Sequence, residues 1–353
     1  MSEGLEVRAE ILKLARLVGR PAEELGWLAV VPSRDLRALR EQVTEVMFAS
    51  SGRRLKRLAA ASKLLPVALL ATIARRVFGP LLSARMAGLI DPERAAGIAA
   101  RLPTSFLADV ARLIDPRRAA AVIAALPAPL VASVARELAL AGEHVTLGRF
   151  VGFLGRDALV ACLEVIDDEA VLHTAFVLEA KERLDMLTGL VSETRLVGII
   201  RAAARADLWP EAVDLLGHLG ASRQASLAEL TAAQGDEVLS SLVRSAQARG
   251  FWDALLPVTR AMSEATRRRL AGLSALHDEG LLEAVVAAAV RHALWSELLP
   301  VARWLPEPLQ RRVIAAGASH QGALDDAARA ALQQLARDLD AKAAAAATRA
   351  ELP

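Results

Sequence analysis

Leu208-Trp209-Pro210-Glu211 recurs with variations as Phe251-Trp252-Asp253-Ala254 and as Leu294-Trp295-Ser296-Glu297. The three tryptophans are 43 residues apart both times. Other apolar positions keep the same spacing through the unit: Leu196, Leu239 and Leu282; Ile200, Val243 and Val286; Ala203, Ala246 and Ala289; Leu219, Met262 and Leu305; Leu227, Leu270 and Val313. A period sustained over a whole unit indicates a repeat protein, in which each unit packs against its neighbours. The sequence therefore predicts an all-α fold, an α-solenoid of stacked helix pairs.

The tryptophans Trp209, Trp252 and Trp295 have two interpretations. As structural repeat anchors, they would pin the turn between paired helices, with the indole N–H reaching a carbonyl there. As an exposed aromatic ladder, they would stack on a peptide or on nucleic-acid bases. We favour the structural interpretation because aromatic residues commonly anchor cores.

A shorter repeat of 24 residues precedes the long one. Leu89-Ile90-Asp91-Pro92 recurs as Leu113-Ile114-Asp115-Pro116, and Leu102-Pro103 recurs as Leu126-Pro127. Asp91 and Asp115 can accept hydrogen bonds from the free amides of a helix start, where a following proline is tolerated. Each 24-residue unit is therefore predicted to be a pair of helices of about ten residues.

This short repeat carries a resemblance to a known family. Over residues 65–140, the pattern Leu-x-Asp-Pro-x-Arg-Ala-Ala, followed by Leu-Pro and Val-Ala-Arg, resembles the cytoplasmic N-terminal helical domain of MgtE-family magnesium transporters. It is similar, more distantly, to the armadillo-like repeats of the flagellar switch protein FliG. In the transporters this domain senses magnesium through acidic surfaces. The equivalent helices here lack the acidic surface and carry Arg94, Arg101, Arg112, Arg117 and Arg118. The resemblance therefore implies the helical-repeat fold and not magnesium sensing.

The stretch 51–90 has an unbalanced charge. It contains eight basic side chains and no acidic one, although the whole chain has a net charge of only +2. The basic residues form the candidate interaction surface: Arg53, Arg54, Lys56, Arg57, Lys63, Arg75, Arg76 and Arg85. The first five flank Leu55, Leu58 and Leu65, a pattern typical of a basic amphipathic helix that binds an anionic surface. The alternative is that these leucines pack on the next repeat while the cations face solvent.

The chain is predicted to have four parts. Residues 1–62 form an N-terminal helical region in which Ser33 caps the second helix, and residues 63–141 form the short repeats. Residues 142–320 form HEAT-like long repeats, the first of them a degenerate copy at 153–195. Residues 321–353 form a capping helix, with Leu324, Leu332, Leu335 and Leu339 on one face, and a tail that frays.

Motifs for catalysis or metal binding are not found. The six histidines are scattered, without a His-x-x-x-His pair, and no Walker sequence or Gly-x-Ser-x-Gly motif occurs. The single cysteine, Cys162, lies in an apolar run and is predicted to be a buried structural thiol. The adjacent pairs Asp167-Asp168 and Asp325-Asp326 are predicted to be helix starts. We therefore expect no cofactor, no metal and no enzymatic activity.

These observations favour a non-enzymatic scaffold that mediates protein–protein interaction in the cytoplasm. The sequence shows no signal peptide and no run of about 18 uncharged apolar residues. The first alternative is a peripheral protein that binds a membrane or another anionic polymer through the basic stretch. The second is a HEAT-like DNA-binding protein or glycosylase, against which the modest charge of the long repeats argues.

Overall fold

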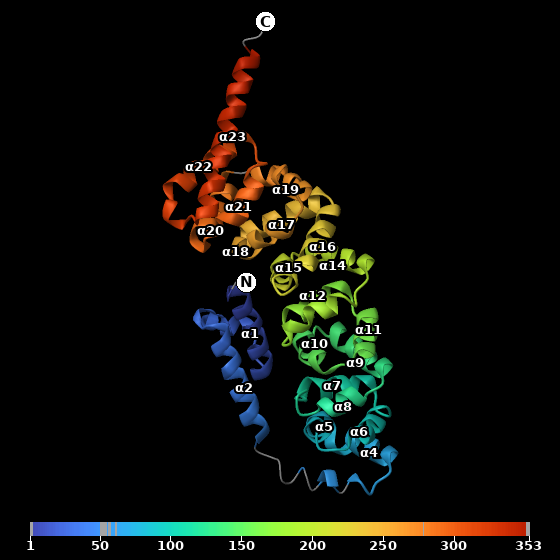
Figure 1. Cartoon of the computed structure of the whole chain (residues 1–353). Coiled ribbons are helices and arrows are strands. Elements are labelled where there is room, and N and C mark those ends of the chain that lie inside the picture. The colour runs from blue at the N-terminus through green and yellow to red at the C-terminus, as the bar shows by residue number, and fades with distance from the viewer. Residues whose placement is uncertain (1–2, 50–54, 56–57, 61, 278, 351–353) are drawn as a thin grey trace. The chain divides into compact units, whose positions relative to one another are not determined.

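The computed structural model describes residues 3–49, 55, 58–60, 62–277 and 279–350. All the regular structure of these residues is helical, which confirms the predicted all-α class (Figure 1). The chain forms two compact units, Glu3–Ser192 and Glu193–Pro353, here called the N-terminal and C-terminal units. This division does not coincide with the predicted change of repeat length near residue 142.

The N-terminal unit begins with a helix trio that precedes the short repeats. Its members are α1 (Glu3–Val18), the 3-10 helix η1 (Ala22–Val30) and α2 (Ser33–Ala49). α1 ends before Gly19, whose φ of +68° favours glycine. The prediction that Ser33 caps α2 is wrong, because Ser33 is the first residue of the helix and the amides of Asp35 and Leu36 donate to the carbonyl of Pro32.

The remaining helices of this unit, 67–188, are called the array. They are α4 (Val67–Ile73), the π-helix η2 (Ala74–Phe78), α5 (Gly79–Ala87), α6 (Pro92–Ala99), α7 (Thr104–Leu113), α8 (Ala120–Ala125), α9 (Ala128–Leu140), α10 (His144–Phe150), η3 (Val151–Phe153), α11 (Arg156–Val165), α12 (Asp168–Phe176), η4 (Lys181–Arg183) and α13 (Leu184–Thr188). α4, α6 and α8 pack in one succession, and α5, α7, α9 and α11 pack in another. Every second helix therefore meets its equivalent in the next short repeat.

The predicted aspartate caps are mostly present. Asp91, Asp167 and Asp325 each accept a hydrogen bond from the amide three residues further on. Asp115 accepts from the amide of Arg117 instead, and α8 begins only at Ala120. The two copies of the short repeat therefore begin their helices differently.

The C-terminal unit contains three helical segments in each 43-residue repeat. They are α14 (Glu193–Arg205), α15 (Trp209–Leu216) and α16 (Ala221–Ala233); α17 (Asp236–Arg249), α18 (Trp252–Leu255) continued by η5 (Leu256–Ala261), and α19 (Glu264–Ala271); then, after η6 (Ser274–His277), α20 (Glu279–His292), α21 (Trp295–Ala302) and α22 (Glu307–Ser319). The predicted helix pairs are therefore wrong for this unit. The extra break falls before Gly220, Ser263 or Pro306, the N-cap residues of the third helix.

One backbone joint recurs in all three repeats. Asp207, Gly250 and Ala293, two residues before each tryptophan, have positive φ angles of 52°, 71° and 54°. A left-handed residue ends a helix by directing the following amides back to its last carbonyls. The joint thus turns each first helix into the helix that the tryptophan begins.

The chain ends in η7 (Gln321–Ala323) and the long helix α23 (Asp326–Ala350). Leu324, Leu332, Leu335 and Leu339 are buried, as the shared face predicted. The helix α23 continues through Ala350, and the fraying of the tail stays a prediction.

Candidate functional site: an apolar and basic end of the array

The candidate interaction residues are partly within the described chain. Arg53, Arg54, Lys56 and Arg57 lie outside the described residues. Lys63, Arg75 and Arg76 are exposed, whereas Arg85 is half-buried. Among the residues that the structure describes, no ion pair joins Lys63, Arg75 or Arg76 to an acidic side chain.

Large apolar side chains are exposed in the same stretch. Leu64 is 87% exposed and Val77 is 72% exposed, and Leu69 and Leu81 are about half exposed. Soluble proteins expose single apolar residues routinely, but several in one short stretch indicate a contact surface. Together with Lys63, Arg75 and Arg76, these four residues are called the apolar-basic end.

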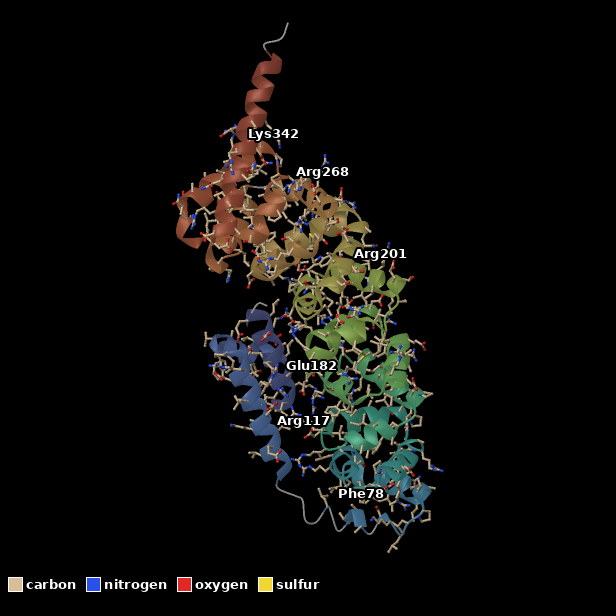
Figure 2. All side chains as sticks on the ribbon, in the orientation of Figure 1. Phe78, Arg117, Glu182, Arg201, Arg268 and Lys342 are labelled. Atoms are coloured by element: carbon tan, nitrogen blue, oxygen red, sulfur yellow. The ribbon has the colours of Figure 1, made fainter. Side chains whose placement is uncertain are left out.

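The backbone explains why these side chains lie outside. Leu69, Ile73 and Val77 follow one another at a spacing of four, so they share one helix face. The π-helix η2 accommodates Arg75, Arg76 and Val77, and π-helical turns are frequent at functional sites. Gly79 then breaks the helix with φ of +66°, followed by Pro80. The half-buried Phe78 marks this turn at the α4–α5 end of the array (Figure 2).

The opposite face of the same stretch packs inward. Leu70 and Ala71 form a buried cluster with Ile98 of α6, and Leu65, Val67 and Leu102 border it. Arg94 of α6 donates hydrogen bonds to the carbonyls of Ser62 and Leu65. The stretch is thus fixed to the array by one face, and only its other face is available for a partner.

This stretch also satisfies a test for a membrane span. Among the described residues, Val67–Ala87 is the one helical segment long and apolar enough to cross a bilayer. Only 17% of its most apolar 18-residue stretch is buried. Arg75 and Arg76 lie in the middle of the segment, and the backbone turns at Gly79. A charged side chain at the centre of a bilayer is costly. These features suit a helix that lies on an interface better than one that spans it.

The repeat tryptophans are buried. Trp209, Trp252 and Trp295 are 4%, 6% and 1% exposed. An exposed aromatic ladder at these positions is therefore ruled out. The predicted bond to a carbonyl is wrong for Trp209, whose Nε1 donates to the hydroxyl Oγ of Ser241, whereas Trp252 Nε1 donates to the side-chain carbonyl Oε1 of Gln247.

The interpretation of the sequence missed a hollow beside Trp304. Glu264, Ala265, Arg268, Arg269 and Trp304 line it, with a volume of about 650 Å³. The guanidinium carbons of Arg268 and Arg303 lie 5.3 and 5.0 Å from the centre of the indole ring. Figure 2 shows Arg268 on the C-terminal unit. The available signal was that Trp304 departs from the 43-residue spacing.

Chemically reactive groups are few in the described part of the chain. Cys162 is buried, and burial raises the pKa of its thiol to about 11, so the thiol form dominates at neutral pH. His144 and His173 stack with ring centres 4.8 Å apart. No group of three or more potential metal ligands occurs among the described residues.

The apolar-basic end and the hollow beside Trp304 are therefore the surfaces that merit a functional interpretation. No family model, curated protein or solved structure matches this chain.

Proposed function

We propose that this chain is a non-enzymatic α-solenoid scaffold that associates peripherally with an anionic lipid surface through the apolar-basic end. The observation that carries the proposal is the exposure of Leu64, Leu69, Val77 and Leu81 among cations that lack described acidic partners. A basic amphipathic surface of this kind inserts apolar side chains between headgroups while its cations meet anionic lipid.

The magnitudes require both contributions. Each Lys or Arg near an anionic membrane contributes about 1 kcal/mol, so Lys63, Arg75 and Arg76 supply roughly 3 kcal/mol. Partial insertion of four apolar side chains, at about half of the roughly 1.5–3 kcal/mol for full burial, adds roughly 3–6 kcal/mol. Micromolar binding needs about 8 kcal/mol. We therefore expect loss of either contribution to abolish measurable binding.

The scaffold part of the proposal rests on the repeats. The described helices pack in succession along the array, and the 43-residue units repeat one backbone joint. Packing of each unit mainly on its neighbours is the organisation of solenoids, including HEAT and armadillo-like proteins. The sequence pattern over residues 65–140, which resembles that of the MgtE N-terminal domain, is the basis for expecting the same architecture there.

Flotation with vesicles tests the proposal. Purified protein is mixed with vesicles of phosphatidylcholine alone or with added phosphatidylserine, at low and high salt. Binding is expected only with the anionic lipid, and weaker at high salt. The charge variant is Arg75→Glu with Arg76→Glu, and its matched control is Arg136→Glu with Arg156→Glu, two exposed arginines elsewhere in the unit.

The apolar contribution has its own variant and control. Val77→Asp should lose binding, whereas Leu140→Asp on α9, which is 74% exposed, should retain it. Equal flotation of wild type with neutral and anionic vesicles would contradict the proposal. If the chain binds neither kind of vesicle, the same surface is instead expected to bind a protein partner. A cytoplasmic scaffold that binds a protein partner is the second candidate function.

A further inference from the structure

The helix trio has a hydrophobic core of its own. Val7, Ile11, Leu14, Leu28 and Leu36 form a buried cluster whose members all come from the trio. Ionic contacts add to it, since the buried Glu10 pairs with Lys13, Arg37 and Arg40 at 2.9–3.3 Å. The trio therefore has the internal contacts of a small folded body.

The contacts that join the trio to the array include ion pairs and a cation–π contact. They are Arg16–Glu143 at 2.9 Å, Arg40–Glu179 at 2.8 Å, Glu41–Arg117 at 3.2 Å and Glu45–Arg118 at 2.9 Å, with the Arg8 guanidinium 5.4 Å from the ring centre of Phe176. Figure 2 shows Arg117 between α2 and the array. Exposed ion pairs contribute little and are screened by salt. The outer half of α2, where the pairs are the most exposed, is thus the weakest part of this contact.

The geometry at this end of α2 is specific. Glu41 and Glu45 are one turn apart, and each meets one of two consecutive arginines of the α7–α8 connection. Arg118 Nη2 donates to both carboxylate oxygens of Glu45 at 2.9 Å. The arginine pair thus recognises two carboxylates displayed on one face of a helix.

The arginines are also positioned by their own loop. Asp115 accepts a hydrogen bond from the amide of Arg117, and its carboxylate lies 3.4 Å from Arg118 Nε. Glu179 lies 3.6 Å from Arg117 Nη2. The preceding repeat has Glu93 where this loop has Arg117, so the basic pair is particular to this repeat. The surface would therefore keep its arrangement when α2 leaves.

We propose that the helix trio is a releasable cover, and that Arg117 and Arg118 beneath it form a docking surface for a partner helix bearing two carboxylates one turn apart. α2 occupies this surface as an intramolecular competitor. Because α2 belongs to the same chain, its effective concentration at this surface is high, and a partner therefore binds the covered chain more weakly than the uncovered one.

Energy transfer between two dyes measures whether the trio lies against the array. Cysteines are introduced at Arg34 on α2, which is 85% exposed on its side chain, and at Leu140 on α9, and dyes are attached for energy transfer. Cys162 should not interfere, since it is buried and its pKa is raised to about 11. Glu41→Arg with Glu45→Arg should lower the transfer efficiency, and so should Arg117→Glu with Arg118→Glu. Combining the four changes should restore it, which a general folding defect would not do.

Docking is measured with a fluorescent peptide of residues 33–49. We expect the Glu41→Arg/Glu45→Arg chain to bind it at least tenfold more tightly than wild type, and to lose binding when the peptide carries Gln at positions 41 and 45. Glu23→Arg with Glu24→Arg on exposed η1 is the control and should behave as wild type. If the energy-transfer efficiency is unchanged in both charge-reversed chains, the trio is not a releasable cover. If wild type and the Glu41→Arg/Glu45→Arg chain bind the peptide with equal affinity, Arg117 and Arg118 do not form a docking surface.

Discussion

Asp207 and Ala293 have the same left-handed backbone conformation, with φ of 52° and 54°, although two repeat lengths separate them. Gly250 occupies the equivalent position in the repeat between them, with φ of 71°. Glycine adopts this conformation without a steric penalty and alanine does not, so the joint at Ala293 carries an avoidable cost, whereas the Asp207 carboxylate accepts hydrogen bonds from Arg249.

Replacement of Ala293 by glycine should therefore stabilise the protein. The left-handed conformation costs a residue with a Cβ about 1–2 kcal/mol, and the added flexibility of the unfolded chain returns part of this. We expect a net gain of roughly 0.5–1 kcal/mol in urea unfolding. Gly250→Ala should lose a similar amount. Ala287→Gly, inside α20, is the control and should destabilise by about 1 kcal/mol; a gain there as well would show that the joint is not the cause.

Substitution of a repeat tryptophan should change stability, because these tryptophans are part of the core. Trp252→Ala should destabilise by roughly 3–5 kcal/mol, because it empties a buried site. Trp27→Ala, at a tryptophan that is 70% exposed, should change stability by no more than about 0.5 kcal/mol. Chemical unfolding measures both. A Trp252→Ala chain of normal stability that failed to bind its partner would reverse the structural assignment.

Two glycines of the short repeats should respond oppositely to alanine. A Cβ on Gly88 would lie 2.3 Å from the carbonyl oxygen of Arg118, so Gly88→Ala must displace backbone and should destabilise by roughly 1–3 kcal/mol. A Cβ on Gly97, inside α6, would make only an ordinary contact with Val67. Gly97→Ala should stabilise by up to about 1 kcal/mol. Thermal unfolding of the two variants and of wild type measures both effects. If both variants are less stable than wild type, the predicted opposite response of the two glycines is wrong.

Acid should weaken the contact between α1 and the array. Burial alone would raise the pKa of Glu143, but hydrogen bonds from Arg16 and Thr146 and the charge of Arg112 bring it below the ordinary 4.5. A lowered carboxyl pKa contributes stability above pH 4.5 that is lost as the pH falls through the folded-state value. Unfolding midpoints between pH 7 and pH 3 should therefore fall less steeply in Glu143→Gln than in wild type. The exposed Glu93→Gln should follow wild type; identical slopes for all three proteins would argue against the assignment.

The 43-residue period located the most buried positions of the C-terminal unit. Ala203, Ala246 and Ala289 are each 0% exposed, and the tryptophans are buried beside the joint. The number of helices per repeat was missed, although Gly220, Ser263 and Pro306 offered a boundary signal at equivalent positions. The repeat period predicts which positions recur, and it does not show where each helix ends.

The contact of Glu41 with Arg117 could not be predicted. The two residues are 76 positions apart, and charged surface residues follow no period that would pair them. The apolar-basic end was predicted in its charge, since the missing acids are visible in the sequence. Its exposed leucines were not, because the same leucine-rich pattern fits a buried helix and only the packing of Leu70 on Ile98 decides which face is covered.

Among the described residues, every large apolar side chain with marked exposure belongs to the N-terminal unit, from Val18 to Met186. This distribution bears on colloidal behaviour. Apolar surface on a folded protein is also the surface through which copies stick together when concentrated or warmed. Charged substitutions at exposed apolar positions in residues 3–192 should therefore lower the turbidity that develops on storage, whereas substitutions in residues 193–350 should change it little. The N-terminal unit is thus the part of the chain to alter when aggregation has to be reduced for solution work.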